Sequence, residues 1–195
     1  MPPLVYFVRH GQTPWNAEFR LQGQAETDIT ALGREQAKRN GRRLAELIEN
    51  PDDFDFVASP LRRTRETMEL VRAEMQLPPG NYTTDARLVE VHFGDWQGST
   101  FAELEAANPG STRARELGKW DFVPPGDGAE SYEMLLRRVR PWFDGLTRPT
   151  VCVTHGGVMR TIFRLVEDIP GDEASMLDIR QDKVLKLENS RLAWL

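Results

Sequence analysis

The sequence predicts an α/β protein, a three-layer α/β/α sandwich in which helices cover both faces of a mostly parallel central sheet. Three short runs, residues 4–8, 54–58 and 150–154, are rich in Val, Phe and Tyr and lack strict alternation. This pattern is typical of strands buried on both faces. Helical patterns follow these runs, and alternating strands and helices form such sandwiches. Because the 195 residues contain no internal repeat or linker, we expect a single domain over residues 1–195.

The helices are predicted from apolar spacing and from residues that typically begin a helix. Residues 31–48 predict the first helix, and residues 61–75 predict the second, with Ser59 as its N-cap. Thr100 begins a capping-box spacing and therefore a further helix. Two more helices are expected, at about residues 131–143 and after residue 157, and a closing hairpin is expected from residues 184–187 and 191–195.

The composition argues against several classes of protein. The net charge of −5 disfavours a nucleic-acid surface, because phosphate backbones are held by clustered Lys and Arg. No stretch approaches the ~20 apolar residues that cross a bilayer, and the first residues do not resemble a secretory signal, so we expect no membrane partner and a cytoplasmic location. The single cysteine, Cys152, lies in an apolar run and is expected to be a buried core residue.

Charged side chains follow directly after the three predicted strands. Arg9 and His10 follow the first strand, Arg63 lies shortly after the second, and His155 follows the third. Open α/β sheets bind ligands at the carboxyl ends of their strands, so these side chains are expected to converge at one edge. Arginine offers a rigid fork of donors to phosphate oxygens, and a glycine such as Gly156 lets a ligand approach the backbone closely. The sequence therefore predicts a pocket for a small phosphate group.

An imidazole can act as a base, a metal ligand or a nucleophile. The chain has only three histidines, His10, His92 and His155, without the spacing of a zinc motif, and the neighbouring arginines would repel a cation. We therefore expect no metal site and no cofactor. A Ser-His-Asp hydrolase is also poorly supported, because the chain has no G-x-S-x-G elbow.

Several further segments carry a more specific pattern. They are RHGQTPWN, RLQG and DITALG (residues 9–16, 20–23 and 28–33), SPLRRTRET (59–67), LVEVHFGDWQG (88–98), PGDGAES (125–131) and VTHGG (153–157). In this order they resemble the signatures of the histidine phosphatase (phosphoglycerate mutase-like) superfamily. The match covers roughly residues 4–165, and several ordered motifs agree by chance far less often than one. The resemblance implies the phosphoglycerate mutase-like fold.

The resemblance also implies a chemistry, phosphoryl transfer through a phosphohistidine. It gives His10 as the nucleophile, and Arg9, Arg63 and His155 as the groups that surround the transferring phosphoryl group. Glu90 would protonate the leaving oxygen and then activate water, which is the kind of general acid-base assistance that this reaction uses. The substrate or phosphate contacts that the resemblance suggests are Asn16, Arg20, Gln22, Gly23 and Gly156.

Departures from the family pattern favour a phosphatase that hydrolyses a small phosphorylated metabolite. In the mutases of this family the segment typically reads Glu-Arg-His-Tyr-Gly, and its Arg and Tyr bind the phosphoglycerate. Here residues 90–94 read Glu-Val-His-Phe-Gly, so Val91 and Phe93 replace both of these groups. A cofactor-dependent phosphoglycerate mutase and a catalytically silent phosphate-binding module stay as alternatives, and a homodimer rests on family analogy alone. His92 and Glu130 can belong to the pocket or to the supporting structure. The variable residues 106–124 can form an apolar wall beside the phosphate or pack as core.

Overall fold

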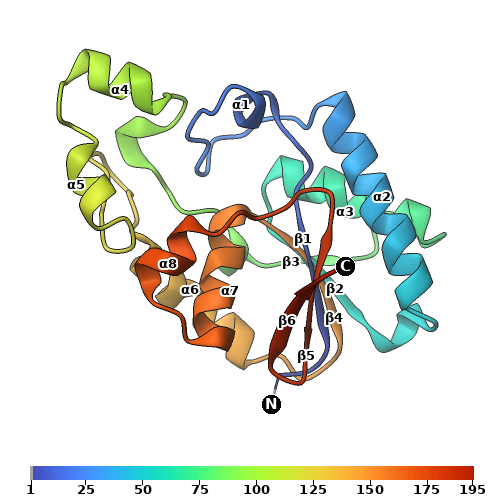
Figure 1. Cartoon of the computed structure of the whole chain (residues 1–195). Helices are drawn as coiled ribbons and strands as arrows, with labels where there is room; N and C mark the ends of the chain where they lie inside the picture. Colours follow the sequence, from blue (N-terminus) through green and yellow to red (C-terminus); the bar gives the residue numbers. More distant parts are fainter. Residues whose placement is uncertain (1) are drawn as a thin grey trace.

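The computed structural model describes residues 2–195, and its centre is one six-stranded sheet between two layers of helices (Figure 1). The strands are β1 (Val5–Arg9), β2 (Asp55–Ala58), β3 (Thr83–Thr84), β4 (Thr150–Thr154), β5 (Val184–Glu188) and β6 (Arg191–Trp194). Their order in the sheet is β3-β2-β4-β1-β5-β6. The strands β3, β2, β4 and β1 run parallel to one another, β5 runs antiparallel to β1, and β5 and β6 form an antiparallel hairpin at one edge. The predicted fold class and the predicted hairpin are confirmed.

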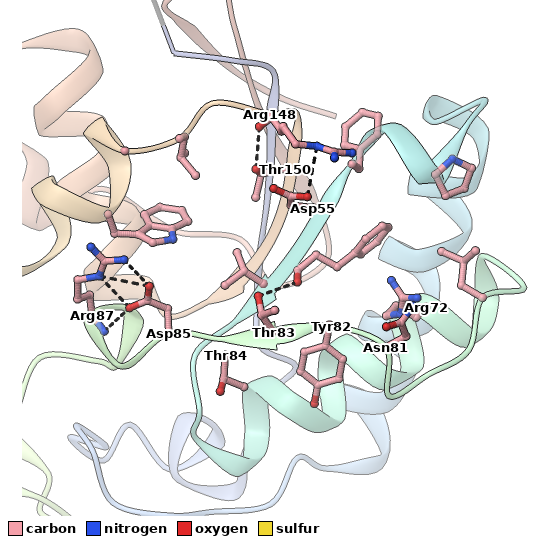
Figure 2. Close-up of a pocket in the computed structure, with 18 of the residues that line it drawn as sticks. Asp55, Arg72, Asn81, Tyr82, Thr83, Thr84, Asp85, Arg87, Arg148 and Thr150 are labelled. Carbon is pink, nitrogen blue, oxygen red and sulfur yellow. Dashed lines mark hydrogen bonds and ion pairs between the residues drawn. The ribbon is translucent and has the colours of Figure 1, made fainter.

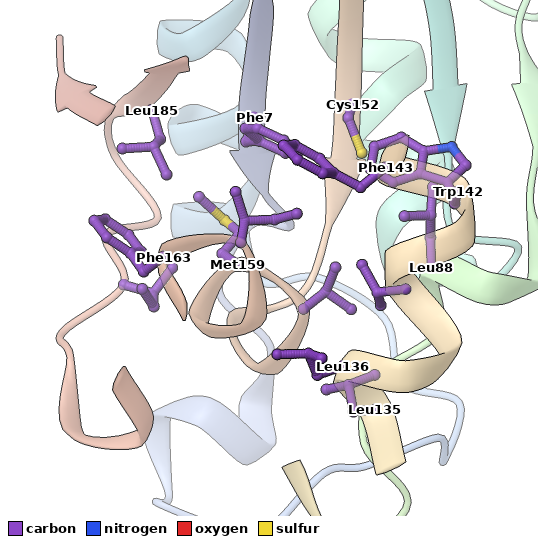
Figure 3. Packing of buried hydrophobic residues seen from close by; sticks show 14 of the residues in the cluster. Phe7, Leu88, Leu135, Leu136, Trp142, Phe143, Cys152, Met159, Phe163 and Leu185 are labelled. Atoms are coloured by element: carbon purple, nitrogen blue, oxygen red, sulfur yellow. The ribbon is translucent and has the colours of Figure 1, made fainter. Parts of the chain in front are cut away.

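The two faces of the sheet carry separate apolar cores. Phe7 of β1 packs into a cluster with Trp142 and Met159 (Figure 3), whereas the next residue, Val8, packs into a cluster with Leu44. Because both faces are covered, each strand is apolar at successive positions and shows no alternation. Cys152 is fully buried in the first cluster, as predicted. The first cluster lies under α6 (Tyr132–Asp144), α7 (Gly156–Glu167) and α8 (Gly171–Met176), and the second under α2 (Ala31–Leu47) and α3 (Arg62–Glu74).

The predicted helices form close to their expected ends, but the start of α3 differs from the prediction. Leu61 occupies the N-cap position of α3, and no side chain caps this helix. The prediction of Ser59 as the N-cap was therefore wrong. The hydroxyl of Ser59 lies 2.8 Å from Nε2 of the buried His155, and this contact fixes its position. Thr100 does form the predicted capping box, at the start of α4 (Phe101–Ala107).

Elements that the sequence pattern did not predict are short. They are α1 (Pro14–Ala17), α5 (Arg113–Leu117), α8, β3 and the 3-10 helices η1 (Pro51–Asp53), η2 (Ala86–Leu88) and η3 (Gly94–Trp96). Segments of this length carry too few residues for a periodic pattern. Within the described part of the chain, the longest apolar helix falls short of what a membrane crossing needs.

Residues 97–123 form an arm that carries α4 and α5 beside the sandwich (Figure 1). Its apolar residues have different roles. Trp120 is buried and stacks on Tyr132 of α6 with ring centroids 5.6 Å apart, and Phe122 stacks on Trp96 at 5.1 Å. These aromatics fasten the arm to the rest of the protein, whereas Leu117 is 78% exposed.

Candidate active site

The carboxyl ends of the central strands bring together the residues that the sequence placed there. Arg9 is the last residue of β1 and His10 follows it, and His155 lies between β4 and α7. The rings of the two histidines are 5.2 Å apart between centroids. A cavity of about 130 Å³ is lined by Arg9, His10, Arg63, Glu90 and Gly156. The convergence expected from the strand-end rule is therefore present in the structure.

His10 is held as a neutral ring with one free nitrogen. Its side chain is buried, and Nδ1 lies 2.8 Å from the carbonyl oxygen of Gly11, which can only accept, so Nδ1 donates. Burial and the positive charges of Arg63 and Arg9 hold the pKa of His10 well below its ordinary value of 6.5. With Nδ1 protonated and the ring neutral, Nε2 keeps its lone pair. The ring is thereby prepared to act as a nucleophile.

Arg9 and Arg63 reach the cavity, and backbone carbonyls hold their guanidinium groups in place. Arg9 Nη1 donates to the carbonyl of Ile179 at 2.8 Å, and Arg63 donates to the carbonyls of Ala25 and Gly23 at 2.8 and 2.7 Å. The Nε of each arginine is buried without a partner. Burial lowers the pKa of both guanidiniums to about 10, so both stay charged near neutral pH.

His155 completes the group of unpaired nitrogens. Its Nε2 lies against Ser59, and its Nδ1 is buried without a partner. Burial, followed by the charge of Arg63, holds its pKa well below 6.5. Within residues 2–195, the buried side-chain nitrogens and oxygens without a hydrogen-bond partner are Arg9 Nε, Arg63 Nε and His155 Nδ1. Such atoms are rare in folded proteins. Arg9 and Arg63 line the cavity and His155 lies against His10, which also lines it, so the three atoms together indicate a site for an anion.

Glu90 is fixed at the cavity by the N-terminus of α7. Its Oε2 accepts from the backbone N–H of Gly157 at 3.0 Å, and its Oε1 accepts from the N–H of Val91 at 2.9 Å. The carbonyl of Glu90 accepts from Gln24 and from Arg138. A Cβ at Gly157 would lie 2.1 Å from Oε1, so only glycine leaves room for the carboxylate.

Comparison with known proteins agrees with this geometry. Residues 5–194 match the family model of the histidine phosphatase superfamily (branch 1). The protein belongs to this superfamily. It is 35% identical to the glucosyl-3-phosphoglycerate phosphatase of Mycolicibacterium vanbaalenii, over 89% of this chain and 78% of that protein. It is 33% identical to phosphoglycerate mutase-like protein 4 of Arabidopsis thaliana, over 82% of this chain and 69% of that protein.

Solved structures of the superfamily give the same result. A mycobacterial glucosyl-3-phosphoglycerate phosphatase complexed with VO3 superimposes with a TM-score of 0.77 at 28% identity, over 99% of this chain and 96% of that chain. YhfR of Bacillus stearothermophilus superimposes with a TM-score of 0.76 at 27% identity, over 98% and 95%. The predicted superfamily, fold and enzyme class, a phosphoric monoester hydrolase, are confirmed, and the phosphoglycerate mutase alternative is less supported.

All five of the expected contact residues line the cavity of this superfamily member, and two of them, Asn16 and Gln22, are joined by a hydrogen bond. Asn16 Oδ1 accepts from Gln181 Nε2 at 3.1 Å, and Asn16 Nδ2 donates to Gln22 Oε1 at 3.3 Å. Gly23 has a φ of +55°, which favours glycine, and turns its carbonyl toward Arg63. Gln181 was not predicted, because its contact with the site comes from the loop before β5, far along the chain.

Arg20 borders the cavity but its charge is already paired. Its guanidinium contacts Glu18 and Glu103 at 2.7 Å each and donates to the carbonyl of Gly98 at 2.8 Å. It therefore joins the first loop to the arm. The suggestion that Arg20 binds phosphate has weaker geometric support than the other contacts.

His92 and Glu130 belong to the supporting structure around Glu90, and neither is among the residues that line the cavity. Nδ1 of His92 accepts from the N–H of Gly94 at 2.9 Å. Glu130 forms an ion pair with Arg138 at 2.8 Å and accepts from the N–H of His92 at 3.1 Å. The two residues thus brace the segment that carries Glu90.

A larger cavity, of about 700 Å³, lies along the edge strand β3 and its neighbour β2 (Figure 2). Its lining contains no histidine, and two of its carboxylates are paired, Asp85 with Arg87 and Asp55 with Arg148. Among the described residues, no three His, Cys, Asp or Glu side chains gather as metal ligands would. The groups suited to phosphoryl transfer are those of the smaller cavity.

Proposed function

We propose that the protein hydrolyses a small phosphate monoester through a phosphohistidine formed on His10. The observation that carries the proposal is the group of unpaired buried donors, Arg9 Nε, Arg63 Nε and His155 Nδ1, beside a neutral His10. Phosphoryl oxygens accept hydrogen bonds and carry negative charge, so one phosphoryl group satisfies both arginine Nε donors and, when the ring proton of His155 is on Nδ1, that nitrogen as well. Phosphoryl transfer depends mainly on this kind of positioning and charge stabilisation.

In the first step, Nε2 of His10 attacks phosphorus and the bond from phosphorus to the ester oxygen breaks. The hydrogen bond from Nδ1 to Gly11 holds the ring and stabilises the positive charge that develops on it. The carboxyl group of Glu90 gives its proton to the departing oxygen, so an alcohol leaves. The guanidiniums of Arg9 and Arg63 stabilise the oxygens that remain on phosphorus.

In the second step, water attacks the phosphorus and the phosphorus–nitrogen bond breaks. The carboxylate of Glu90 takes a proton from the attacking water, and this proton replaces the one that Glu90 gave to the departing alcohol. Phosphate leaves, and His10 returns to its neutral form. The low pKa of His10 favours this step, because a weakly basic imidazole is a good leaving group.

The choice of first substrates follows from the relatives. Two of these relatives are named glucosyl-3-phosphoglycerate phosphatase. Glucosyl-3-phosphoglycerate and the simpler phosphoglycerates are therefore the first esters to test as substrates. Phe93 lines the cavity at the position where a mutase would grip its substrate with tyrosine, which favours release of phosphate over its return. A cytoplasmic location, a single domain and a homodimer stay predictions from the sequence.

The test is hydrolysis of an aryl phosphate in the presence of a chelator, with radiolabelled phosphoenzyme trapped by rapid quench. Turnover and a label that is stable in base and labile in acid are expected, and both are lost in His10→Ala. His92→Ala, which removes a histidine outside the cavity, keeps the label. Phosphate binding without turnover on a broad panel of esters would contradict the proposal and favour the silent binding module.

A further inference from the structure

The carbonyl that binds His10 belongs to a peptide group with a hydrogen bond at each end. Nδ1 of His10 donates to the carbonyl oxygen of Gly11 at 2.8 Å. The N–H of the same peptide group, which is that of Gln12, donates to the side-chain oxygen Oε1 of Gln36 at 2.9 Å. Hydrogen bonds at the two ends of one peptide group polarise each other, so the contact with Gln36 makes the Gly11 carbonyl a stronger acceptor for the imidazole N–H.

The preceding peptide group, between His10 and Gly11, is also held at both ends. Its carbonyl accepts from Gln181 Nε2 at 3.0 Å, and its N–H donates to Oγ1 of Thr67 at 3.0 Å. Thr67 is fully buried, and its hydroxyl donates to the carbonyl of Arg63, one turn earlier in α3, at 2.7 Å. One hydroxyl therefore joins the backbone beside the nucleophile to the helix that carries Arg63.

The start of α2 packs directly against the same backbone. The N–H of Thr30, just before α2, donates to the carbonyl of Gln12 at 2.7 Å. A Cβ on Gly11 would lie 2.2 Å from the carbonyl oxygen of Gly33, and a Cβ on Gly33 would lie 2.3 Å from that of Gln12. A larger residue at either position would push α2 away and separate Gln36 from the N–H of Gln12. The DITALG segment thereby has a role that the phosphate contacts do not explain.

The Gly11 carbonyl matters most when the ring of His10 is charged. Burial, Arg63 and Arg9 lower the pKa of His10, and the hydrogen bond to Gly11 raises it, because this bond favours the positively charged ring. A phosphoryl group on Nε2 also gives the ring positive charge. A stronger acceptor at Gly11 therefore stabilises the phosphohistidine and the transition state that leads to it. The same bond keeps the ring proton on Nδ1 and the lone pair on Nε2.

We infer that Gln36 and Thr67 are positioning residues for phosphoryl transfer, which hold the two peptide groups that orient the ring of His10 and polarise the carbonyl that it binds. The inference rests on the proposed function, because it concerns the step in which Nε2 of His10 attacks phosphorus. Gln36 sets the acceptor strength of the Gly11 carbonyl, and Thr67 sets the place of this backbone relative to α3. Neither residue is among those that line the cavity, so both act on the rate of phosphorylation rather than on substrate binding.

The test measures the rate at which labelled phosphoenzyme forms at saturating aryl phosphate, by rapid quench, together with KM. Gln36→Leu removes the acceptor and is expected to slow phosphorylation about tenfold, the effect of one ordinary hydrogen bond, while KM stays within about twofold. Gln36→Glu keeps an oxygen that accepts from the N–H of Gln12 and is expected to restore most of the rate. Gln76→Leu is the matched control, since it makes the same change at an exposed glutamine after α3 and is expected to keep the rate.

Thr67→Val keeps the shape of the side chain but removes its hydroxyl, and it is expected to slow phosphorylation about tenfold. Thr67→Ser retains the hydroxyl and is expected to restore most of the rate. Thr161→Val is the matched control, because the hydroxyl of Thr161 is also fully buried and donates to a carbonyl of its own helix, that of Val158. This control is expected to lower stability and to leave phosphorylation within about twofold. Thermal melting checks that each variant is folded.

Two results overturn the inference while leaving the proposed function intact. A wild-type rate of phosphorylation in Gln36→Leu or in Thr67→Val overturns the role of that residue, and so does a loss of rate that Gln36→Glu or Thr67→Ser fails to restore. If the wild-type protein forms no phosphohistidine, the proposed function fails by itself. Proton NMR of the resting protein still tests the positioning in that event. The Nδ1–H signal of His10 is expected to move upfield in both variants as its hydrogen bond weakens, and an unmoved signal overturns the inference.

Discussion

Ser59→Ala removes the hydroxyl that lies 2.8 Å from Nε2 of His155, and we expect it to lower turnover while the protein stays folded. A neutral imidazole carries one N–H, and the low pKa of His155 keeps the ring neutral. When Ser59 donates to Nε2, the ring proton is on Nδ1, the nitrogen without a partner. Because phosphoryl oxygens only accept hydrogen bonds, this tautomer is the one that can bind them. Ser59 is therefore a positioning residue in the proposed mechanism.

The size of the effect follows from the burial of His155, whose side chain is fully enclosed. Without Ser59, Nε2 has no partner in either tautomer, and leaving a buried polar atom unpaired costs about 1–3 kcal/mol. The ring can then also protonate on Nε2, which turns Nδ1 into an acceptor facing the phosphoryl oxygens. If this cost falls on the transition state, kcat decreases by about 5- to 150-fold.

The assay is steady-state hydrolysis of an aryl phosphate, together with thermal melting. Thr150→Val is the matched control, because it removes a buried hydroxyl that donates to the carbonyl of Arg148 at the opposite end of β4. We expect it to cost about 1 kcal/mol of stability and to leave kcat within about twofold. A Ser59→Ala protein with kcat equally close to wild type would refute the tautomer argument. So would nitrogen NMR that shows Nε2 of His155 protonated in the wild-type protein.

Three further changes test other parts of the site. Gly157→Ala places a methyl group 2.1 Å from Oε1 of Glu90, so we expect kcat to fall by about 10²-fold or more through loss of the general acid, whereas Gly80→Ala, with no atom within 4 Å of its Cβ, keeps kcat. Arg138→Gln removes donors to the carbonyls of residues 87, 89 and 90, and is expected to lower the free energy of unfolding by about 1–3 kcal/mol in urea and to lower kcat more than it changes KM. Burial holds the pKa of both site histidines well below 6.5, so below about pH 6.5 the unfolded chain binds protons that the folded chain does not, and stability is lost as the pH falls. In urea unfolding from about pH 5 to 7.5, His10→Gln is expected to reduce this slope by up to about 1.4 kcal/mol per pH unit near pH 5 and by little above about pH 7, and an unchanged slope near pH 5 would contradict the neutral state of His10.

The parts of the fold that could be predicted are those that local sequence determines. Residues 4–8 and 151–153 are apolar at successive positions because both faces of their strands are covered, and this pattern is visible in the sequence alone. The position of His10 and His155 at strand ends then follows from the parallel arrangement alone. The sequence could therefore predict which residues meet at the site where they directly follow a strand.

What could not be predicted depends on contacts between distant segments. Ser59 has the local pattern of an N-cap, but its hydroxyl binds a histidine 96 residues away, and this tertiary contact decides its role. The family resemblance suggested Arg20 as a phosphate contact, but the fold places Glu103 against it.

The positive field of the site serves two purposes that would conflict in a solvent-exposed arrangement. A phosphate dianion needs cations close by. A nucleophilic histidine must stay unprotonated, although the negative charge of the dianion would raise the pKa of the histidine. Here Arg9 and Arg63 stay charged because even their lowered pKa is about 10, and the same charges, added to burial, hold the pKa of His10 well below 6.5. The buried arginines therefore attract the substrate and keep the nucleophile neutral at the same time. A lysine in place of Arg63 would do this less well, because burial lowers the pKa of an ammonium group toward neutrality, as it does for Lys119.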